Sequence, residues 1–282
     1  MKAATSLEEM SNLLTSSEEK KEGVPVSILD HIKVRSAARP RVTLIHGLSG
    51  LGKTTWAASF PDPVIVQTED GCADIEVAST PVATKWDSVL AVLNELASPD
   101  VEHGYKTVVL DSADHFEGLV YKALHLESFP SDYGRGEVEC TRRFKMMMDS
   151  LISCRARGLN VVIIAHSALK SVQDPFGNSY DRYSPKLSKR NNALVTEMVD
   201  EIGFARQQIF MAEAKVKFGT QTVAKSTGEV SLDFGPSPAF VSKKRLPGLP
   251  DSVDLWSWGE YAQYVPFLQG NGPAPENPEG TV

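Results

Sequence analysis

Apolar residues follow two alternating patterns along the chain, short apolar runs and longer stretches with helical spacing. The short runs occupy residues 41–46, 64–68, 107–110 and 160–165. Runs of this kind are typical of strands that are buried on both faces of a sheet. The stretches with helical spacing occupy residues 86–96, 115–127 and 140–157. This alternation predicts an α/β fold in which helices cover both faces of a mostly parallel sheet.

The pattern becomes less regular after residue 166. Residues 167–190 contain the turn Asp174-Pro175-Phe176-Gly177-Asn178 and no apolar run, so we predict a long irregular loop there. Residues 192–200 are predicted to form a helix. Beyond it we expect a C-terminal hairpin of two antiparallel strands, residues 202–218 and 229–234, joined by a turn around Thr227-Gly228.

Three parts of the chain are expected to behave differently. Residues 1–40 are largely polar and charged, so we predict an N-terminal arm or linker that is partly disordered. Residues 41–265 carry the alternating pattern and should form one core domain. A chain of 282 residues is long enough to bury a hydrophobic core of that size. Residues 266–282 are rich in Pro, Gly and Asn, which predicts a disordered tail.

The strongest motif follows the first predicted strand. It reads Gly47-Leu48-Ser49-Gly50-Leu51-Gly52-Lys53-Thr54, and Thr55 begins a short predicted helix. This is the Walker A pattern, in which glycines let backbone N–H groups curl around phosphate. Lys53 is placed to reach the β- and γ-phosphates, and the Thr54 hydroxyl to hold Mg²⁺. We therefore predict an ATP site at these residues, with Mg²⁺ as cofactor.

Two carboxylates at predicted strand ends extend this site. Asp111 closes the run at residues 107–110, the place of a Walker B ligand for Mg²⁺. Ser112 follows it, so the adjacent Glu of AAA+ ATPases is absent. RecA-type ATPases instead place the water-activating Glu at the end of the strand after the phosphate loop, where Glu69 stands. Asp70 is the competing carboxylate, and a Glu that caps a turn is the structural alternative.

Further downstream, one histidine and three basic residues are candidates for contact with the γ-phosphate. His166 ends the fourth predicted strand, where RecA-like folds place a polar sensor, although a structural histidine fits equally well. Lys186, Lys189 and Arg190 are candidates to act on a neighbouring subunit's γ-phosphate, with Lys186 and Lys189 ahead of Arg190. Contact with DNA phosphates, or a solvated surface, explains these three residues equally well.

Composition limits the cellular compartments and the binding partners that we expect for this protein. The net charge of −7 argues against affinity of the whole surface for nucleic acid, so any such binding must be local. The three cysteines show no C-x-x-C spacing, which favours a reducing compartment without disulfides or a zinc site. We find no apolar run long enough for a membrane span and no signal-peptide segment, so we expect a protein of the bacterial host cytoplasm.

Taken together, the motifs resemble a family, the phage-encoded RecA-like ATP-binding proteins that are grouped with AAA-type ATPases. Some of these are similar to a minimal core of the RadA-type recombinases and act as single-strand annealing proteins. The resemblance covers about residues 40–255. It rests on the Walker A loop and on segments at residues 57–61, 68–71, 105–112, 133–136, 160–166, 181–183, 186–187, 236–240 and 246–250.

The resemblance implies a RecA-like ATPase core that assembles head to tail into rings or filaments, with ATP at subunit interfaces. It also implies that loops at residues 133–139 and 167–190 bind single-stranded DNA, with a single-stranded-DNA-binding protein as a further partner. Aromatic side chains there suit stacking on bases, and basic ones suit phosphates. The DNA-binding candidates are Tyr133, Arg135, Lys170, Phe176 and Arg182. The separate N-terminal DNA-binding domain and Phe-x-x-Ala linker of larger recombinases are not found, which leaves the mode of assembly open.

The expected function is thus a DNA-stimulated ATPase that binds single-stranded DNA and promotes annealing or strand exchange in phage recombination. One alternative is a hexameric motor ATPase of the helicase or packaging type, although the chain has room for only one ATPase core. Another is a nucleotide-dependent switch, or a small-molecule kinase, that does not act on DNA. A kinase would need lid arginines on a helical insert, which the sequence does not show.

Overall fold

The computed structural model describes residues 39–126, 134–174, 176–216, 219–256, 258–266 and 268, without the side chains of residues 210–216 and 219–225. The chain divides into two compact units, Met1–Ala37 and Ala38–Val282. The first unit lies outside the described residues, so the predicted arm at residues 1–40 stays a prediction. The same holds for the predicted tail at residues 266–282, of which only residues 266 and 268 are described.

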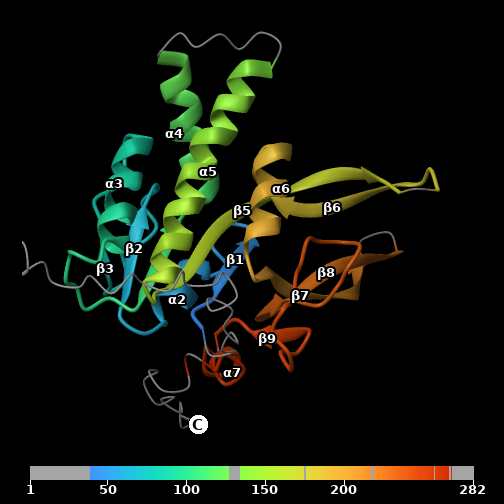
Figure 1. The fold of residues 1–282 in the computed structure, drawn as a ribbon. Coiled ribbons are helices and arrows are strands. Elements are labelled where there is room, and N and C mark those ends of the chain that lie inside the picture. The colour runs from blue at the N-terminus through green and yellow to red at the C-terminus, as the bar shows by residue number, and fades with distance from the viewer. Residues whose placement is uncertain are drawn as a thin grey trace, which may run out of the picture. The chain divides into compact units, whose positions relative to one another are not determined.

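The described part of the second unit is built on a nine-stranded sheet in the order β3-β2-β4-β5-β1-β7-β8-β9, with β6 paired to β5 (Figure 1). The strands are β1 (Val42–Gly47), β2 (Pro63–Gln67), β3 (Ala78–Ser79), β4 (Thr107–Asp111), β5 (Asn160–Gln173), β6 (Ser179–Pro185), β7 (Glu201–Val216), β8 (Gly219–Asp233) and β9 (Ser252–Asp254). The sheet is parallel from β3 to β7, and β8 and β9 continue it antiparallel. The predicted α/β class, with a mostly parallel sheet and a C-terminal antiparallel hairpin, is confirmed.

The strand order brings the ends of three strands together. β1 leads into the Walker A loop and β4 ends at Asp111, and β5 lies between them as a parallel neighbour of both. The carboxyl ends of these three strands therefore meet at one edge of the sheet, where ligands of open parallel sheets bind.

Helices cover both faces of the sheet, as the apolar strands predicted. One face carries α3 (Trp86–Ala97), α4 (Ala113–Leu126), α5 (Arg135–Ala156) and α6 (Lys189–Met198), and the other carries α2 (Lys53–Ala58) and α7 (Trp258–Ala262). Neighbouring strand residues point to opposite faces, so Leu44 of β1 packs in the first layer and Ile45 in the second. None of the described helices is long and apolar enough to cross a membrane.

The prediction of a long irregular loop at residues 167–190 is wrong. β5 continues to Gln173 and pairs with β6 in a regular antiparallel hairpin, which reaches out past α6 in Figure 1. The Asp174 carboxylate accepts hydrogen bonds from the backbone N–H groups of Phe176 and Asn178 and so shapes the turn. The hairpin's outer part is solvent-exposed and lacks the apolar run by which a buried strand is recognised.

Two other predicted boundaries are also wrong. β8 begins at Gly219, so Thr227-Gly228 lies within that strand, beside a register shift between Gln207 and Ile209 of β7. A bulge with a glycine at positive φ resembles a turn in sequence. Residues 135–139, expected in a loop, form the first turns of α5.

The core of the first layer should be sensitive to truncation in α5. Phe144 is fully buried and packs edge to face on Phe116 of α4, at 6.0 Å between ring centroids. We expect Phe144→Ala to lower the free energy of unfolding by about 3–5 kcal/mol, because the cavity cannot close completely. Val138→Ala, on the same helix but 52% exposed, should change it by less than about 0.5 kcal/mol. Urea denaturation of the two variants tests this, and equal losses would contradict the assigned helix face.

Candidate active site

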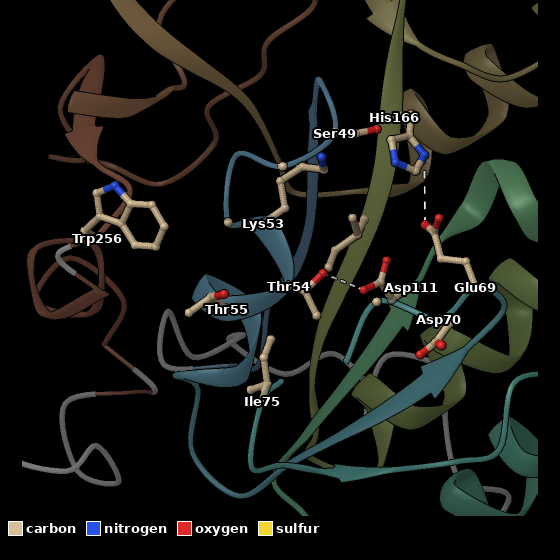
Figure 2. A pocket seen from close by; sticks show the side chains of 14 residues that line it. Ser49, Lys53, Thr54, Thr55, Glu69, Asp70, Ile75, Asp111, His166 and Trp256 are labelled. Atoms are coloured by element: carbon tan, nitrogen blue, oxygen red, sulfur yellow. Dashed lines mark hydrogen bonds and ion pairs between the residues drawn. The ribbon is translucent and has the colours of Figure 1, made fainter. Parts of the chain in front are cut away.

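The carboxyl ends of β1, β2, β4 and β5 surround a cavity of about 510 Å³ (Figure 2). It is lined by Ser49, Gly50, Gly52, Lys53, Thr54, Thr55, Glu69, Asp70, Gly71, Ile75, Asp111, Ile164, His166 and Trp256. Most of the residues predicted for nucleotide binding, and those predicted for metal binding and water activation, therefore line one cavity, whereas Gly47, Leu48 and Leu51 of the predicted loop do not line it. Trp256 is the member of this set that comes from the far end of the chain.

The Walker A residues form the tight loop that the motif requires. Gly50 and Gly52 adopt φ values of +76° and +82°, which other residues adopt only with strain. Lys53 is buried at the start of α2, and its Nζ donates to the Leu48 carbonyl at 2.7 Å, so the lysine lies folded against the loop. Burial lowers the pKa of Lys53, against the raising effect of Asp111 and Glu69.

A hydroxyl and a carboxylate form the centre that suits a metal ion. Thr54 Oγ1 donates to Asp111 Oδ2 at 2.7 Å, and burial raises the pKa of Asp111 above its usual range. A Cβ added at Gly71 would lie 3.1 Å from Asp111 Oδ2 and 3.6 Å from Thr54 Oγ1, so the glycine leaves one side of this pair open. Oxygen ligands beside open space suit Mg²⁺, which keeps several of its waters. Thr54 and Asp111 therefore fit the predicted ion.

Glu69 lies just past the end of β2 and faces the two histidines of the site. Its Oε2 is 2.8 Å from Nδ1 of His115, and its Oε1 is 3.9 Å from Nδ1 of His166. Figure 2 shows Glu69 turned toward His166, whereas Asp70 points elsewhere along the cavity. Both carboxylates line the cavity, and Glu69 also contacts the imidazoles of His115 and His166.

His166 is held in place by Asp114 at the start of α4. The Asp114 carboxylate accepts from the backbone N–H of His166 at 3.0 Å and lies 3.0 Å from its Nδ1. Hydrogen bonding to Asp114 raises the pKa of His166, against the effect of burial. Burial raises the pKa of Asp114, but its bonds with His166 outweigh this and lower it to about 2. This contact fixes the ring and leaves its Nε2 as the atom free to face a ligand.

Sequence reasoning missed three residues of the site, Asp114, His115 and Trp256. The first two follow Asp111 within four positions, and their spacing on the first turn of a helix was the available signal. Glu69, His115 and His166 also offer donor atoms within 4.8 Å of one another, a spacing that a cation tolerates, although hydrogen bonds already account for all three. Trp256 follows β9, and its sequence neighbours carry no nucleotide-binding signal.

The basic residues predicted to act across a subunit interface do not enter this cavity. Lys186, Lys189 and Arg190 are exposed, and none of them lines it. The Lys186 backbone N–H donates to the His166 carbonyl at 2.8 Å, so the end of β6 is tied to the strand that carries His166.

The predicted DNA-binding residues are placed in different parts of the fold. Phe176 stands at the tip of the β5–β6 hairpin with 90% of its surface exposed. Lys170 donates to the Leu187 carbonyl and Arg182 to the Phe240 carbonyl, at 2.7 and 3.2 Å. Arg135 is exposed on the first turn of α5, and Tyr133 lies outside the described residues.

Comparison with known proteins gives a family match over most of the chain. The family model described as AAA domain matches residues 39–246, which include every strand from β1 to β8. Among solved structures, the chain is similar to the flagellar accessory protein FlaH from Methanocaldococcus jannaschii, with 10% identity and a TM-score of 0.33 over 67% of this chain and 79% of that one. A likeness this distant says nothing about function. A search of curated proteins gave no match.

The first site prediction separates Glu69 from Asp70. We expect Glu69→Gln to retain ATP binding and to reduce hydrolysis by about 10²–10⁴-fold, the usual effect of losing a general base. Asp70→Asn, which changes the neighbouring carboxylate in the same way, should leave more than a tenth of the rate. Steady-state phosphate release and ATP titration measure the two effects. The opposite ranking would assign the base to Asp70.

The second site prediction concerns the pairing of His166 with Asp114. Asp114→Asn should lower the pKa of His166, because the hydrogen bond to the carboxylate is the main cause that raises it. A raised folded-state pKa stabilises the fold fully below the unfolded value of about 6.5, and this contribution is lost as the pH rises through the folded value. The variant's deficit in unfolding free energy should therefore shrink over that range. NMR titration of the ring is the direct measurement, and an unchanged pKa would refute the pairing.

Proposed function

This chain belongs to the AAA domain family. From that premise we propose that it hydrolyses ATP and that the reaction controls its affinity for single-stranded DNA. Support for hydrolysis comes from the cavity, which brings together Lys53, Thr54, Asp111 and Glu69. Support for DNA comes from a single feature of the fold, the unbroken strand that leads from that cavity into an exposed hairpin.

In the proposed reaction, the Walker A loop and Lys53 bind the β- and γ-phosphates, and Thr54 and Asp111 hold Mg²⁺. The ion would neutralise charge on the β- and γ-phosphate oxygens. Glu69 accepts a proton from a water whose oxygen attacks the γ-phosphorus, while the bond to the β–γ bridging oxygen breaks and ADP leaves. His166 donates from Nε2 to a γ-phosphate oxygen and loses that partner when phosphate departs.

The strand β5 carries the proposal on DNA. Its first six residues are buried in the sheet, and His166 at the cavity follows directly. The same strand then continues to Gln173 and, with β6, forms the hairpin that ends at Phe176. A displacement of His166 on phosphate release would therefore act on the base of this hairpin, because no loop intervenes.

One face of the hairpin has the chemistry that single-stranded DNA requires. Lys170 lies directly opposite Arg182, and Val172 lies opposite Tyr180, so all four side chains share one face. Two cations suit backbone phosphates, and Tyr180 together with the exposed ring of Phe176 suits stacking on bases. Both cations also donate to backbone carbonyls near the base of the hairpin, Lys170 to Leu187 and Arg182 to Phe240, so a DNA phosphate would compete with these bonds.

Assembly is proposed from the positions of Lys186 and Lys189. Both are exposed and lie close in sequence to the base of the hairpin, and neither lines this chain's own cavity. We propose that one of them reaches the γ-phosphate bound by a neighbouring copy, in a head-to-tail ring or filament. Each nucleotide site would then be completed by the next subunit.

Within this function, single-strand annealing or strand exchange in phage recombination is the form we propose, with a single-stranded-DNA-binding protein as a further partner. A small core whose β5–β6 hairpin leads out from the cavity suits the binding of a single strand, and the compartment would be the host cytoplasm. A hexameric motor and a nucleotide switch that does not act on DNA are the competing functions.

The test is ATP hydrolysis with and without single-stranded DNA. We expect DNA to stimulate hydrolysis, and DNA affinity to fall as the salt concentration rises. Phe176→Ala should weaken DNA binding by about 5- to 150-fold, because one base–aromatic stack is lost, while ATP binding is kept. Ile209→Ala is the control, since this side chain is 63% exposed on the other hairpin. Fluorescence anisotropy of a labelled oligonucleotide gives the affinities.

The outcomes separate the competing functions. Loss of hydrolysis in Lys53→Ala ties turnover to this cavity, and normal turnover in that variant would end the ATPase proposal. An ATP hydrolysis rate that single-stranded DNA does not change at low salt would favour the nucleotide switch. Sizing with a non-hydrolysable ATP analogue tests assembly, and a monomer under all conditions would contradict the role of Lys186 or Lys189.

A further inference from the structure

We infer that Trp256 forms the wall on which the base of the bound nucleotide stacks. This inference rests on the proposed function, because it assumes that the cavity holds a nucleoside triphosphate. It assigns a ligand to a residue that lies outside the family match at residues 39–246 and outside the Walker motifs.

The phosphate loop and the metal pair fix the direction in which a nucleotide must lie. Glu69, Asp111 and His166 gather on one side of Lys53 and Thr54, and this is the end that would face the γ-phosphate (Figure 2). The ribose and base must leave on the other side. Figure 2 shows Trp256 on that side, across the cavity from Asp111 and His166.

The indole lies directly against the phosphate loop. A Cβ added at Gly52 would come within 2.4 Å of Cη2 of Trp256, and within 3.2 Å of two further ring carbons. The ring therefore borders the loop where Gly52 turns into α2. A base joined to phosphates held by this loop would start within reach of the indole.

The segment that carries Trp256 is fixed, so the ring is presented in a set position. Leu255 is buried in the second core layer, and its backbone N–H donates to the Val230 carbonyl at 2.9 Å. The Asp254 carboxylate accepts from the Trp256 backbone N–H at 3.0 Å. This anchoring reduces the ordering that a base would otherwise have to impose on the wall.

The ring itself remains available to a ligand. Trp256 is 57% exposed, although it borders a cavity and has rigid neighbours. The described aromatic contacts of the second core layer involve Trp56, Phe60, Phe234, Trp258 and Tyr261 but not Trp256. Stacking of a flat base on this half-exposed indole would contribute favourable binding free energy, because it removes apolar surface from water. It would also allow the offset contact that aromatic faces prefer.

The experiment compares ATP with inorganic tripolyphosphate, which carries the phosphates without the base. Isothermal titration with Mg²⁺ present gives both affinities for the wild type and for three variants. Trp256→Ala should weaken ATP binding by about 5- to 150-fold, the range for loss of one base–aromatic stack, and should leave tripolyphosphate binding unchanged. Trp256→Phe should keep ATP affinity within about threefold, because it retains an aromatic face. Tyr105→Ala, an exposed aromatic that does not line the cavity, is the control.

Each alternative outcome is distinct. Equal ATP affinity in wild type and Trp256→Ala would overturn the stacking role and leave the proposed ATPase intact. Equal losses for ATP and tripolyphosphate would mean that Trp256 supports the loop and not the base, which also overturns it. A change of oligomeric state in Trp256→Ala at unchanged ATP affinity would assign the ring to a subunit contact. Wild-type protein that binds neither compound would overturn both this inference and the proposed nucleotide function.

Discussion

The parallel pairing of β5 with both β1 and β4 is the constraint on which the site depends. The register places Gly47 of β1 beside His166 and Asp111 of β4 beside Ile164. The phosphate loop, the Walker B carboxylate and the histidine therefore end at nearly the same level. A shift of two residues in either pairing would move one of these groups by about 6–7 Å, given the rise of a strand, and would break the site.

The helix α4 contacts the polar side chains that the sheet brings close to one another. Its first turn supplies Asp114, which binds His166, and His115, which binds Glu69. One turn further, the buried carboxylate of Glu117 accepts from the Ser188 backbone N–H and from the Asn191 side chain, at the start of α6. A single helix thus contacts His166, Glu69 and the segment that follows the hairpin. Such an arrangement suits coupling between the nucleotide and a distant surface, because helices transmit displacement with little bending.

The electrostatics of the cavity are those of a site that needs its ligand. Burial disfavours the charged forms of both Lys53 and Asp111, so their pKa values shift toward neutrality from opposite sides. Lys53 donates to the backbone carbonyls of Gly47 and Leu48, and Asp111 accepts from the Thr54 hydroxyl, which compensates only part of that cost. In the proposed function, phosphate oxygens and Mg²⁺ would supply the missing opposite charges to these two buried groups at the edge of the sheet.

The sequence alone determined the four buried parallel strands β1, β2, β4 and the first part of β5, together with the groups at their ends. Apolar runs such as residues 107–110 can be recognised from neighbouring positions alone, and the Walker A spacing indicates that its residues bind phosphate together. The hairpin of β5 and β6 escaped this reasoning, because its outer residues face water and only cross-strand pairing makes them a strand. Asp114 and His115 carried a weak local signal, while the approach of Trp256 to Gly52 carried none. That contact exists because β7, β8 and β9 extend the sheet and return the chain to the phosphate loop, and only the tertiary structure sets where such a return ends.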